Sequence, residues 1–516
     1  IAAVVLRLSD FEGGGLSKMQ AVGQSLGRVK AAGKRVFAVG DGFSQDQYYL
    51  AAHADEIFLH TLGAVFVDGL SYYRTYFRSA LDKLNVDLHV FRVGEYKSFV
   101  EPFIRDDMSD EDKEASRRWL NALWDEFQRD VTQARGLDST ALHRYANGYA
   151  RALRQTNGDT ARLALEAGLV DELLSREAAH RRILEYVGAS DDQPDEYDSI
   201  DYQRYLAAVR GSRPSSVGKD KVGVIIASGQ IVDGKALPGT VGGDSMASLV
   251  RQAAEDDSVR ARVIRIDSPG GSMFASEVIF DQLQSFKATG KPLVASMSSV
   301  AASGGYYLAM AGDEIWAHPS TITGSIGIGA IVPTIPRALE QLGVSVDGIG
   351  TTSLSGALRV DRELGPEARE ILQATIDSGY RIFVGKVAEA RGMSIARAGE
   401  LAEGRVWVGT DALEIGLVDQ FGDLDDAVAS AAQLAGLDEG RFEESFILPE
   451  MSLREQLMMR LAERAEGLVR WAIPETLRVQ ADAIGLLYAG LERELAGLTA
   501  LNDPRGLYYH CFCAVP

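Results

Sequence analysis

Residues 298–329 read SSVAASGGYYLAMAGDEIWAHPSTITGSIGIG, and residues 41–70 read DGFSQDQYYLAAHADEIFLHTLGAVFVDGL. An offset of 258 residues aligns the paired tyrosines, the tripeptide Asp-Glu-Ile and the histidine that follows it. Matches at the same offset continue outward, for example from Leu339 to Leu81. The chain therefore contains one domain-sized unit twice, with a period too long for a solenoid. These units are called copy one and copy two below.

The two copies differ at the positions that could carry chemistry. At the common offset, Ser303 of copy two falls on Gln45, and Lys97 of copy one falls on Ser355. One copy thus has a serine without a lysine, and the other has a lysine without a serine. Neither copy is expected to be active alone, so the duplication predicts one composite site per chain.

The pattern of hydrophobic residues predicts an α/β protein. Short β-branched runs such as ARVIRI and PLVASM alternate with longer helical patterns such as MFASEVIFDQLQSFKATG. This alternation is typical of βαβ units and a largely parallel sheet. A polar stretch, SDDQPDEYDSIDY followed by GSRPSSVGKDK, indicates a linker. We expect copy one over residues 1–205, copy two over 206–450 and a helical C-terminal extension over 451–516.

Composition excludes several classes of protein. The 516 residues include 53 basic and 73 acidic side chains, a net charge of −20, which argues against a nucleic-acid partner. The two cysteines give neither a disulfide framework nor the spacing of metal ligands, and no cofactor is expected. No apolar run reaches the roughly 18 residues that span a bilayer. The chain begins within a strand-like run and without Met, so we expect a further N-terminal segment in the full protein.

Ser303 is the candidate nucleophile. It lies in AASGGYY, between a strand-like run and a helical pattern, where backbone N–H groups stabilise developing negative charge. The alternative is a serine that merely caps the helix. A second motif, Asp-Ser-Pro-Gly-Gly-Ser, follows the strand ARVIRI and favours the catalytic interpretation. The N–H groups of Gly270, Gly271 and Gly304 could form an oxyanion hole.

The candidate base is a lysine. The chain has no histidine between His318 and His510, and His318 has a counterpart in the copy without the serine, so a Ser-His-Asp triad is disfavoured. An amine that is desolvated among apolar neighbours can be neutral near pH 7 and act as a general base. Lys97 lies in FRVGEYKSFVEPF, whose aromatic residues could desolvate it, although a solvated surface lysine is the commoner case. Ser325, which is matched by Val67 in copy one, could orient the lysine.

The motifs SPGGS, AASGGYY, TGSIG and YKSFVEPFIRDDMS resemble the long, duplicated form of the signal peptide peptidase A (protease IV) family. The resemblance covers essentially the whole chain, to LNDPRGLYY near its end. It implies Ser303 as nucleophile, Lys97 as general base, Ser325 as the residue that coordinates the lysine, and glycines near Gly271 and Gly304 as the oxyanion hole. It also implies a fold shared with the Clp-type proteases and the crotonases.

The same resemblance implies a serine endopeptidase that degrades signal peptides and other small apolar peptides through an acyl-enzyme. It further implies a homo-oligomer, a tetramer by family pattern, on the periplasmic face of the bacterial inner membrane, held there by an N-terminal anchor. Two alternatives stay open at this point. A crotonase-like acyl-CoA enzyme would need no serine nucleophile, and an inactive scaffold would need neither residue.

Overall fold

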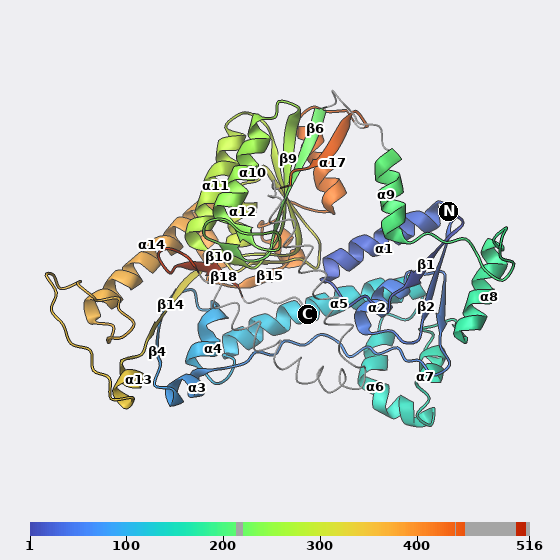
Figure 1. Cartoon of the computed structure of the whole chain (residues 1–516), viewed down its shortest axis with the longest axis horizontal. Helices are drawn as coiled ribbons and strands as arrows, with labels where there is room; N and C mark the ends of the chain where they lie inside the picture. The colour runs from blue at the N-terminus through green and yellow to red at the C-terminus, as the bar shows by residue number, and fades with distance from the viewer. Residues whose placement is uncertain (213–219, 439, 449–501, 512–516) are drawn as a thin grey trace.

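The first element of the fold is a four-stranded parallel sheet in copy one (Figure 1). The computed structural model describes residues 1–212, 220–438, 440–448 and 502–511. The strands, in spatial order, are β1 (Ala3–Arg7), β2 (Arg35–Gly40), β3 (Glu56–Leu59) and β5 (Glu172–Leu173). The helical segments of copy one are α1 (Leu16–Ala31), α2 (Gln45–Ala51), α3 (Arg78–Lys83), η1 (Ser98–Val100), α4 (Glu101–Ile104), α5 (Asp110–Arg135), α6 (Ala141–Gln155), α7 (Thr160–Glu166), α8 (Arg176–Val187) and α9 (Tyr202–Ser212).

Copy two repeats this sheet and extends it. The matching strands are β9 (Val259–Ser268), β11 (Leu293–Ala302), β12 (Glu314–Ala317) and β16 (Gln420–Phe421), which pair in the same order and are also parallel. The additional strands are β6 (Asp220–Ser228), β13 (Ile322–Gly324), β15 (Val406–Val408) and β17 (Phe442–Phe446). The helices are α10 (Gly243–Glu255), α11 (Met273–Lys287), α12 (Gly304–Ala309), α13 (Pro336–Gln341), α14 (Pro366–Ala390), α15 (Ile395–Leu401), α16 (Gly409–Glu414) and α17 (Leu424–Leu434). Strand β11 is buried along its whole length, as a central parallel strand with helices on both faces should be.

The two copies therefore have corresponding elements, and the duplication predicted from the sequence is confirmed in three dimensions. β3 and β12 match residue for residue at the offset of 258, as do α3 and α13. The offset is 256 at the starts of α5 and α14 and falls to 248 for β5 and β16, because α6 of copy one has 15 residues where α15 of copy two has 7. The parallel sheets and their helices also confirm the α/β class.

A six-stranded sheet joins the two copies. Its strands are, in order, β4 (Asp87–Val93), β14 (Ile328–Thr334), β18 (Tyr508–His510), β10 (Gly270–Ser272), β7 (Ile231–Val232) and β8 (Val241–Gly242). β4 of copy one and β14 of copy two are antiparallel over seven residue pairs, from Val93 with Ile328 to Asp87 with Thr334. In Figure 1 these two strands run together toward the lower left, away from the sheets of both copies.

The prediction of a helical C-terminal extension is wrong for the last described residues. A helical extension was expected over residues 451–516, but residues 508–510 form the short strand β18 in the joining sheet. Residues 449–501 and 512–516, on which the rest of that prediction falls, lie outside the described residues. The boundaries 1–205, 206–450 and 451–516 stay a prediction. The six-stranded sheet takes strands from all three segments.

The copies also share side-chain contacts near the glycine-rich motif. Lys18 of α1 forms an ion pair with Asp267 at 2.6 Å, and the hydroxyls of Ser17 and Ser299 are 2.9 Å apart. The hydrophobic core of copy one includes Val300 and other residues of β11 and β13. Copy one is thus packed against the end of copy two where the candidate site lies.

Candidate functional site

Ser303 lies at the junction of β11 and α12. The first turn of the short helix α12 begins at this residue, whose carbonyl oxygen accepts a hydrogen bond from the N–H of Tyr307 at 2.9 Å. Its φ is 54° and its ψ is −113°, an unusual conformation for a residue with a side chain and one that costs about 1–3 kcal/mol. The Ser303 N–H donates to the carbonyl of Gly324 at 2.7 Å, which holds the residue in this conformation. Ser303 is fully buried.

Lys97 comes from copy one and enters the site between β4 and η1. The pairing of β4 with β14 carries the end of β4 to the neighbourhood of Ser303. Lys97 Nζ lies 2.8 Å from Ser303 Oγ, and Lys97 is 1% exposed. Burial lowers the pKa of Lys97 well below its usual value of 10.5, because the ammonium form loses its hydration. Phe99, whose ring centre is 5.9 Å from Nζ, contributes to this apolar surrounding.

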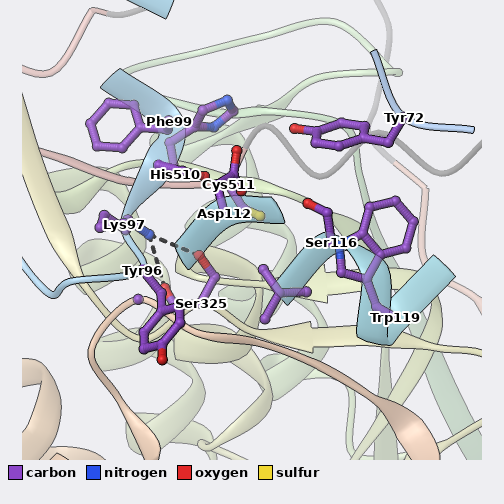
Figure 2. A pocket seen from close by; sticks show the side chains of 13 residues that line it. Tyr72, Tyr96, Lys97, Phe99, Asp112, Ser116, Trp119, Ser325, His510 and Cys511 are labelled. Atoms are coloured by element: carbon purple, nitrogen blue, oxygen red, sulfur yellow. Dashed lines mark hydrogen bonds between the residues drawn. The ribbon is translucent and has the colours of Figure 1, made fainter. Parts of the chain in front are cut away.

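Ser325 completes a three-residue cluster. Lys97 Nζ donates hydrogen bonds to the backbone oxygen of Ser325 at 2.9 Å and to its Oγ at 3.0 Å (Figure 2). Ser325 is buried and has a positive φ of 49°. Its own N–H donates to the carbonyl of Arg405 at 2.7 Å. The structure thus brings together the serine, the lysine and the second serine that the sequence singled out.

The three predicted oxyanion glycines lie in two adjacent segments. Gly270 and Gly271 form the start of β10, and Gly304 is the first residue of α12. A methyl group on Gly304 would lie 3.0 Å from the Cα of Gly270, so these two backbones are in close contact. The N–H of Gly270 already donates to Ser268 Oγ at 3.2 Å. Because α12 has only six residues, its dipole is small. A negative charge here would be stabilised by hydrogen bonds from individual N–H groups.

Gly404 was missed by the sequence analysis. It lies directly against Lys97: a methyl group on Gly404 would be 2.7 Å from the Cβ and the backbone nitrogen of that lysine. The neighbouring carbonyl of Glu403 accepts a hydrogen bond from the N–H of Tyr96 at 2.9 Å. This contact depends on the pairing of β4 with β14, and no motif in the sequence points to it.

A small pocket lies beside the amine, and the C-terminal segment lines part of it. Figure 2 shows His510 and Cys511 on one side of this pocket and Lys97 and Ser325 on another. Its volume is about 20 Å³, room for about one water molecule. Burial is the main cause that lowers the pKa of His510 to about 3, and the charge of Lys97 adds to it. The sequence analysis gave no role to this segment.

His318, which was disfavoured as the base, and Ser355, the counterpart of Lys97, have other surroundings. His318 lines a larger cavity of about 490 Å³ together with His53 and Asp130, and burial lowers its pKa to about 4. Ser355, which the offset equates with Lys97, lies in the segment after α13, and its Oγ accepts a hydrogen bond from the N–H of Thr352 at 3.2 Å. In the part of the chain that the structure describes, no three His, Cys, Asp or Glu side chains are grouped so that they could hold a metal ion.

A serine hydroxyl that lies at the end of a parallel strand and contacts a buried amine is an arrangement suited to an α/β serine hydrolase. The chain belongs to peptidase family S49, whose family model matches residues 28–184 and 285–438, one segment in each copy. The Clp protease family model matches residues 217–321 of copy two, which confirms the predicted fold class.

The similarity extends to whole proteins. The chain is 39% identical to protease 4 of Salmonella typhi over 516 residues, which cover 100% of this chain and 81% of that protein. It is 36% identical to protease 4 of Haemophilus influenzae, over 99% of this chain and 82% of that protein. A chloroplastic serine protease of Arabidopsis thaliana, SPPA, is 28% identical over 85% of this chain and 64% of its own length.

These matches confirm the family resemblance seen in the sequence. The chain is a serine protease, and the acyl-CoA and scaffold alternatives are disfavoured. Among the helices of residues 1–212, 220–438, 440–448 and 502–511, none is both long and apolar enough to cross a membrane.

Proposed function

We propose that the chain is an endopeptidase with a Ser-Lys dyad, in which Ser303 is the nucleophile and Lys97 the general base. The observation that carries the proposal is the 2.8 Å separation of Lys97 Nζ from Ser303 Oγ in a fully buried setting. An ordinary serine hydroxyl is a weak nucleophile and needs a base in contact with it. A desolvated lysine is neutral over a wider range of pH than an exposed one, so it can take up the proton.

The first half of the reaction forms an acyl-enzyme. The neutral amine of Lys97 accepts the hydroxyl proton of Ser303 while Oγ attacks the carbonyl carbon of the scissile amide. The tetrahedral intermediate then collapses: the C–N bond breaks, the leaving amine takes the proton from the Lys97 ammonium, and the acyl group remains on Oγ as an ester. The amine of Lys97 is neutral again at the end of this half.

The second half releases the acyl group. Lys97 accepts a proton from a water molecule as the water oxygen attacks the ester carbonyl, and then returns the proton to Ser303 Oγ as the C–O bond breaks. In both halves, Ser325 would hold the lysine in position through its 3.0 Å contact. The oxyanion would be held by N–H groups of the two adjacent glycine segments, that of Gly304 and those of Gly270 and Gly271.

Peptide cleavage by matched variants tests the dyad. We expect Ser303→Ala and Lys97→Met each to lower kcat by at least about 10³-fold, because triad-type residues act as one unit. The controls are Ser285→Ala, a serine on the exposed face of α11, and Lys287→Met, whose amine pairs with Asp313. Mass spectrometry of the quenched reaction should find an acyl group on the wild-type chain and none on Ser303→Ala. Cleavage at a near-wild-type rate by Ser303→Ala or by Lys97→Met would contradict the proposed dyad.

We propose signal peptides and other short apolar peptides as substrates, and a homo-oligomer at the periplasmic face of the bacterial inner membrane as the working form. Support comes from the family resemblance and from the two bacterial relatives named protease 4. Incubation with a synthetic signal peptide and, separately, with a folded globular protein tests the substrate class. Rapid cleavage of the peptide alone is expected, and equal cleavage of both would contradict it.

A further inference from the structure

The C-terminal strand β18 lies between β10 and β14 (Figure 1), and its residue His510 lines the same small pocket as Lys97. It is antiparallel to β10, with His510 opposite Gly270 and Tyr509 opposite Gly271. Hydrogen bonds extend the pairing on both sides: the N–H of Met273 donates to Leu507 at 3.0 Å, and that of Cys511 donates to Pro269 at 2.8 Å. The segment thus runs alongside the glycines that are candidates for the oxyanion hole.

β18 pairs with the edges of β10 and β14 to which an extended peptide would hydrogen-bond. The other edge of β10 is taken by β7, through Gly271 and Ile231, and the other edge of β14 is taken by β4. β14 itself pairs with Tyr508 through Gly329. Peptides that add to a sheet gain their affinity from such main-chain hydrogen bonds. An extended peptide and β18 would therefore compete for the same two strands.

The backbone of β18 also lies close to the proposed reacting groups. A methyl group on Gly270 would collide with the carbonyl oxygen of Tyr509 and would lie 2.6 Å from the amide nitrogen of Gly304. One peptide carbonyl of β18 and one candidate oxyanion donor thus face the same side of Gly270. The next residue, His510, lines the same small pocket as Lys97 (Figure 2).

The side chain of Tyr509 fills an aromatic pocket. It is fully buried, its ring centre is 5.1 Å from that of Tyr307 and 4.7 Å from that of Phe383, and its hydroxyl donates to the carbonyl of Gly379 at 3.0 Å. Strand recognition typically combines main-chain pairing with pockets for alternate side chains, and β18 shows both features.

We propose that β18 occupies the place of an extended peptide substrate and inhibits the protease from within the same chain. A substrate would bind antiparallel to β10 after β18 leaves, with a large aromatic or apolar side chain in the pocket of Tyr509. This inference rests on the proposed function, because it takes Ser303 as the nucleophile.

Asp503 anchors the segment and gives a way to loosen it without changing the dyad. Its carboxylate accepts hydrogen bonds from Ser272 Oγ at 2.6 Å and from the N–H of Phe274 at 2.9 Å, at the start of α11. It also accepts from the N–H groups of Arg505 and Leu507 within the segment. Asp503→Ala removes all four bonds, whereas Asp438→Ala, at a surface ion pair with Arg441, is the matched control.

The first measurement is the steady-state cleavage of one apolar reporter peptide by full-length enzymes. We expect Asp503→Ala to raise kcat/KM by about 10-fold, mainly through a lower KM, because hydrogen bonds to a charged group are the stronger kind. Asp438→Ala should match the wild type. An Asp503→Ala enzyme that unfolds at the wild-type temperature but has unchanged or lower kcat/KM would show that β18 is only a structural strand.

The second measurement does not depend on the folding of a variant. The synthetic peptide NDPRGLYYH, which copies residues 502–510, should inhibit the wild-type enzyme competitively, and the same peptide with tyrosine 509 replaced by alanine should inhibit at least about 10-fold less. Equal potency of the two peptides, or no inhibition by either, would overturn the inference. These failures would leave the dyad intact if Ser303→Ala is inactive, whereas an active Ser303→Ala would refute the proposed function itself.

Discussion

Lys97 Nζ and Ser303 Oγ are 2.8 Å apart although 206 residues separate the two in the sequence. The contact is made within one chain, by a residue of each copy. It depends on β4 of copy one and β14 of copy two, whose seven residue pairs fix the position of the lysine. In the alignment of the two copies, Lys97 falls on Ser355 and Ser303 falls on Gln45. In the structure, the two copies thus each contribute one residue to a single cluster.

The first prediction concerns activity and pH. Lys97 must be neutral to accept a proton, and burial lowers its pKa well below 10.5. We therefore expect kcat/KM to be lost as the pH falls through this lowered pKa and to level off above it. The measurement is the pH profile of kcat/KM between about pH 5 and 11, with the stability of the enzyme checked at each pH. A profile that rises only near pH 10 would mean that the lysine is not desolvated in solution.

The second prediction concerns stability. In the window between the lowered folded pKa of Lys97 and its usual 10.5, the unfolded chain binds a proton that the folded chain does not. Stability therefore falls as the pH drops through that window. Lys97→Met removes this penalty, so at neutral pH the variant should be more stable by about 0.5–2 kcal/mol, the size of common stabilising substitutions. Thermal unfolding of both enzymes should show the gain shrinking toward pH 10.

The third prediction concerns Ser325. Ser325→Ala removes one acceptor from Lys97 Nζ but leaves the backbone contact at 2.9 Å. We expect kcat to fall by about 10-fold with little change in KM, as for the loss of one hydrogen bond. The acid limb of the pH profile should also move to lower pH, because the ammonium form loses an acceptor. Ser320→Ala, a buried serine bonded to Gln20, is the control and should show neither change.

The fourth prediction concerns Gly404. Its φ is +73°, and a methyl group there would be 2.7 Å from Lys97, so Gly404→Ala must displace the lysine. We expect a 10- to 100-fold lower kcat, roughly the cost of a 1 Å misplacement, and a loss of about 1–2 kcal/mol in unfolding free energy. Gly385→Ala, in α14 with open space around its Cα, should leave kcat unchanged. Equal kcat values for the two variants would show that the Lys97 segment can shift without consequence.

The fifth prediction follows from the location of both residues in one chain. When full-length Ser303→Ala and Lys97→Met enzymes are mixed, refolded together and assayed, we expect no recovery of activity, because each chain lacks one member of its own dyad. A sample refolded from wild type and Ser303→Ala measures the yield of refolding. Substantial recovery in the first mixture would show that the lysine reaches a serine in another chain.

Local sequence patterns were sufficient to predict the parallel sheets, the duplication and the three residues of the cluster. Ser303 and Ser325 directly follow strand-like runs in the sequence. Lys97 could be identified because the other copy has Ser355 at the matching position. The role of Gly404 and the strand β18 left none. Both are defined by contacts between segments distant in sequence, and a three-residue strand such as β18 has too few residues to show a period. Most of the shift of offset from 258 to 248 likewise reflects the difference in length between α6 and α15, which changes no motif.

The pairing of β4 with β14 also sets the order of events during synthesis. The ribosome completes the lysine 206 residues before it reaches the serine, an interval of roughly 10 to 40 s at common elongation rates. In the proposed mechanism, the growing chain thus contains the base before the nucleophile, and the two come into contact only after β14 has been made and has paired with β4. By this mechanism, the ability to cut peptides therefore arises only after β14 has paired with β4.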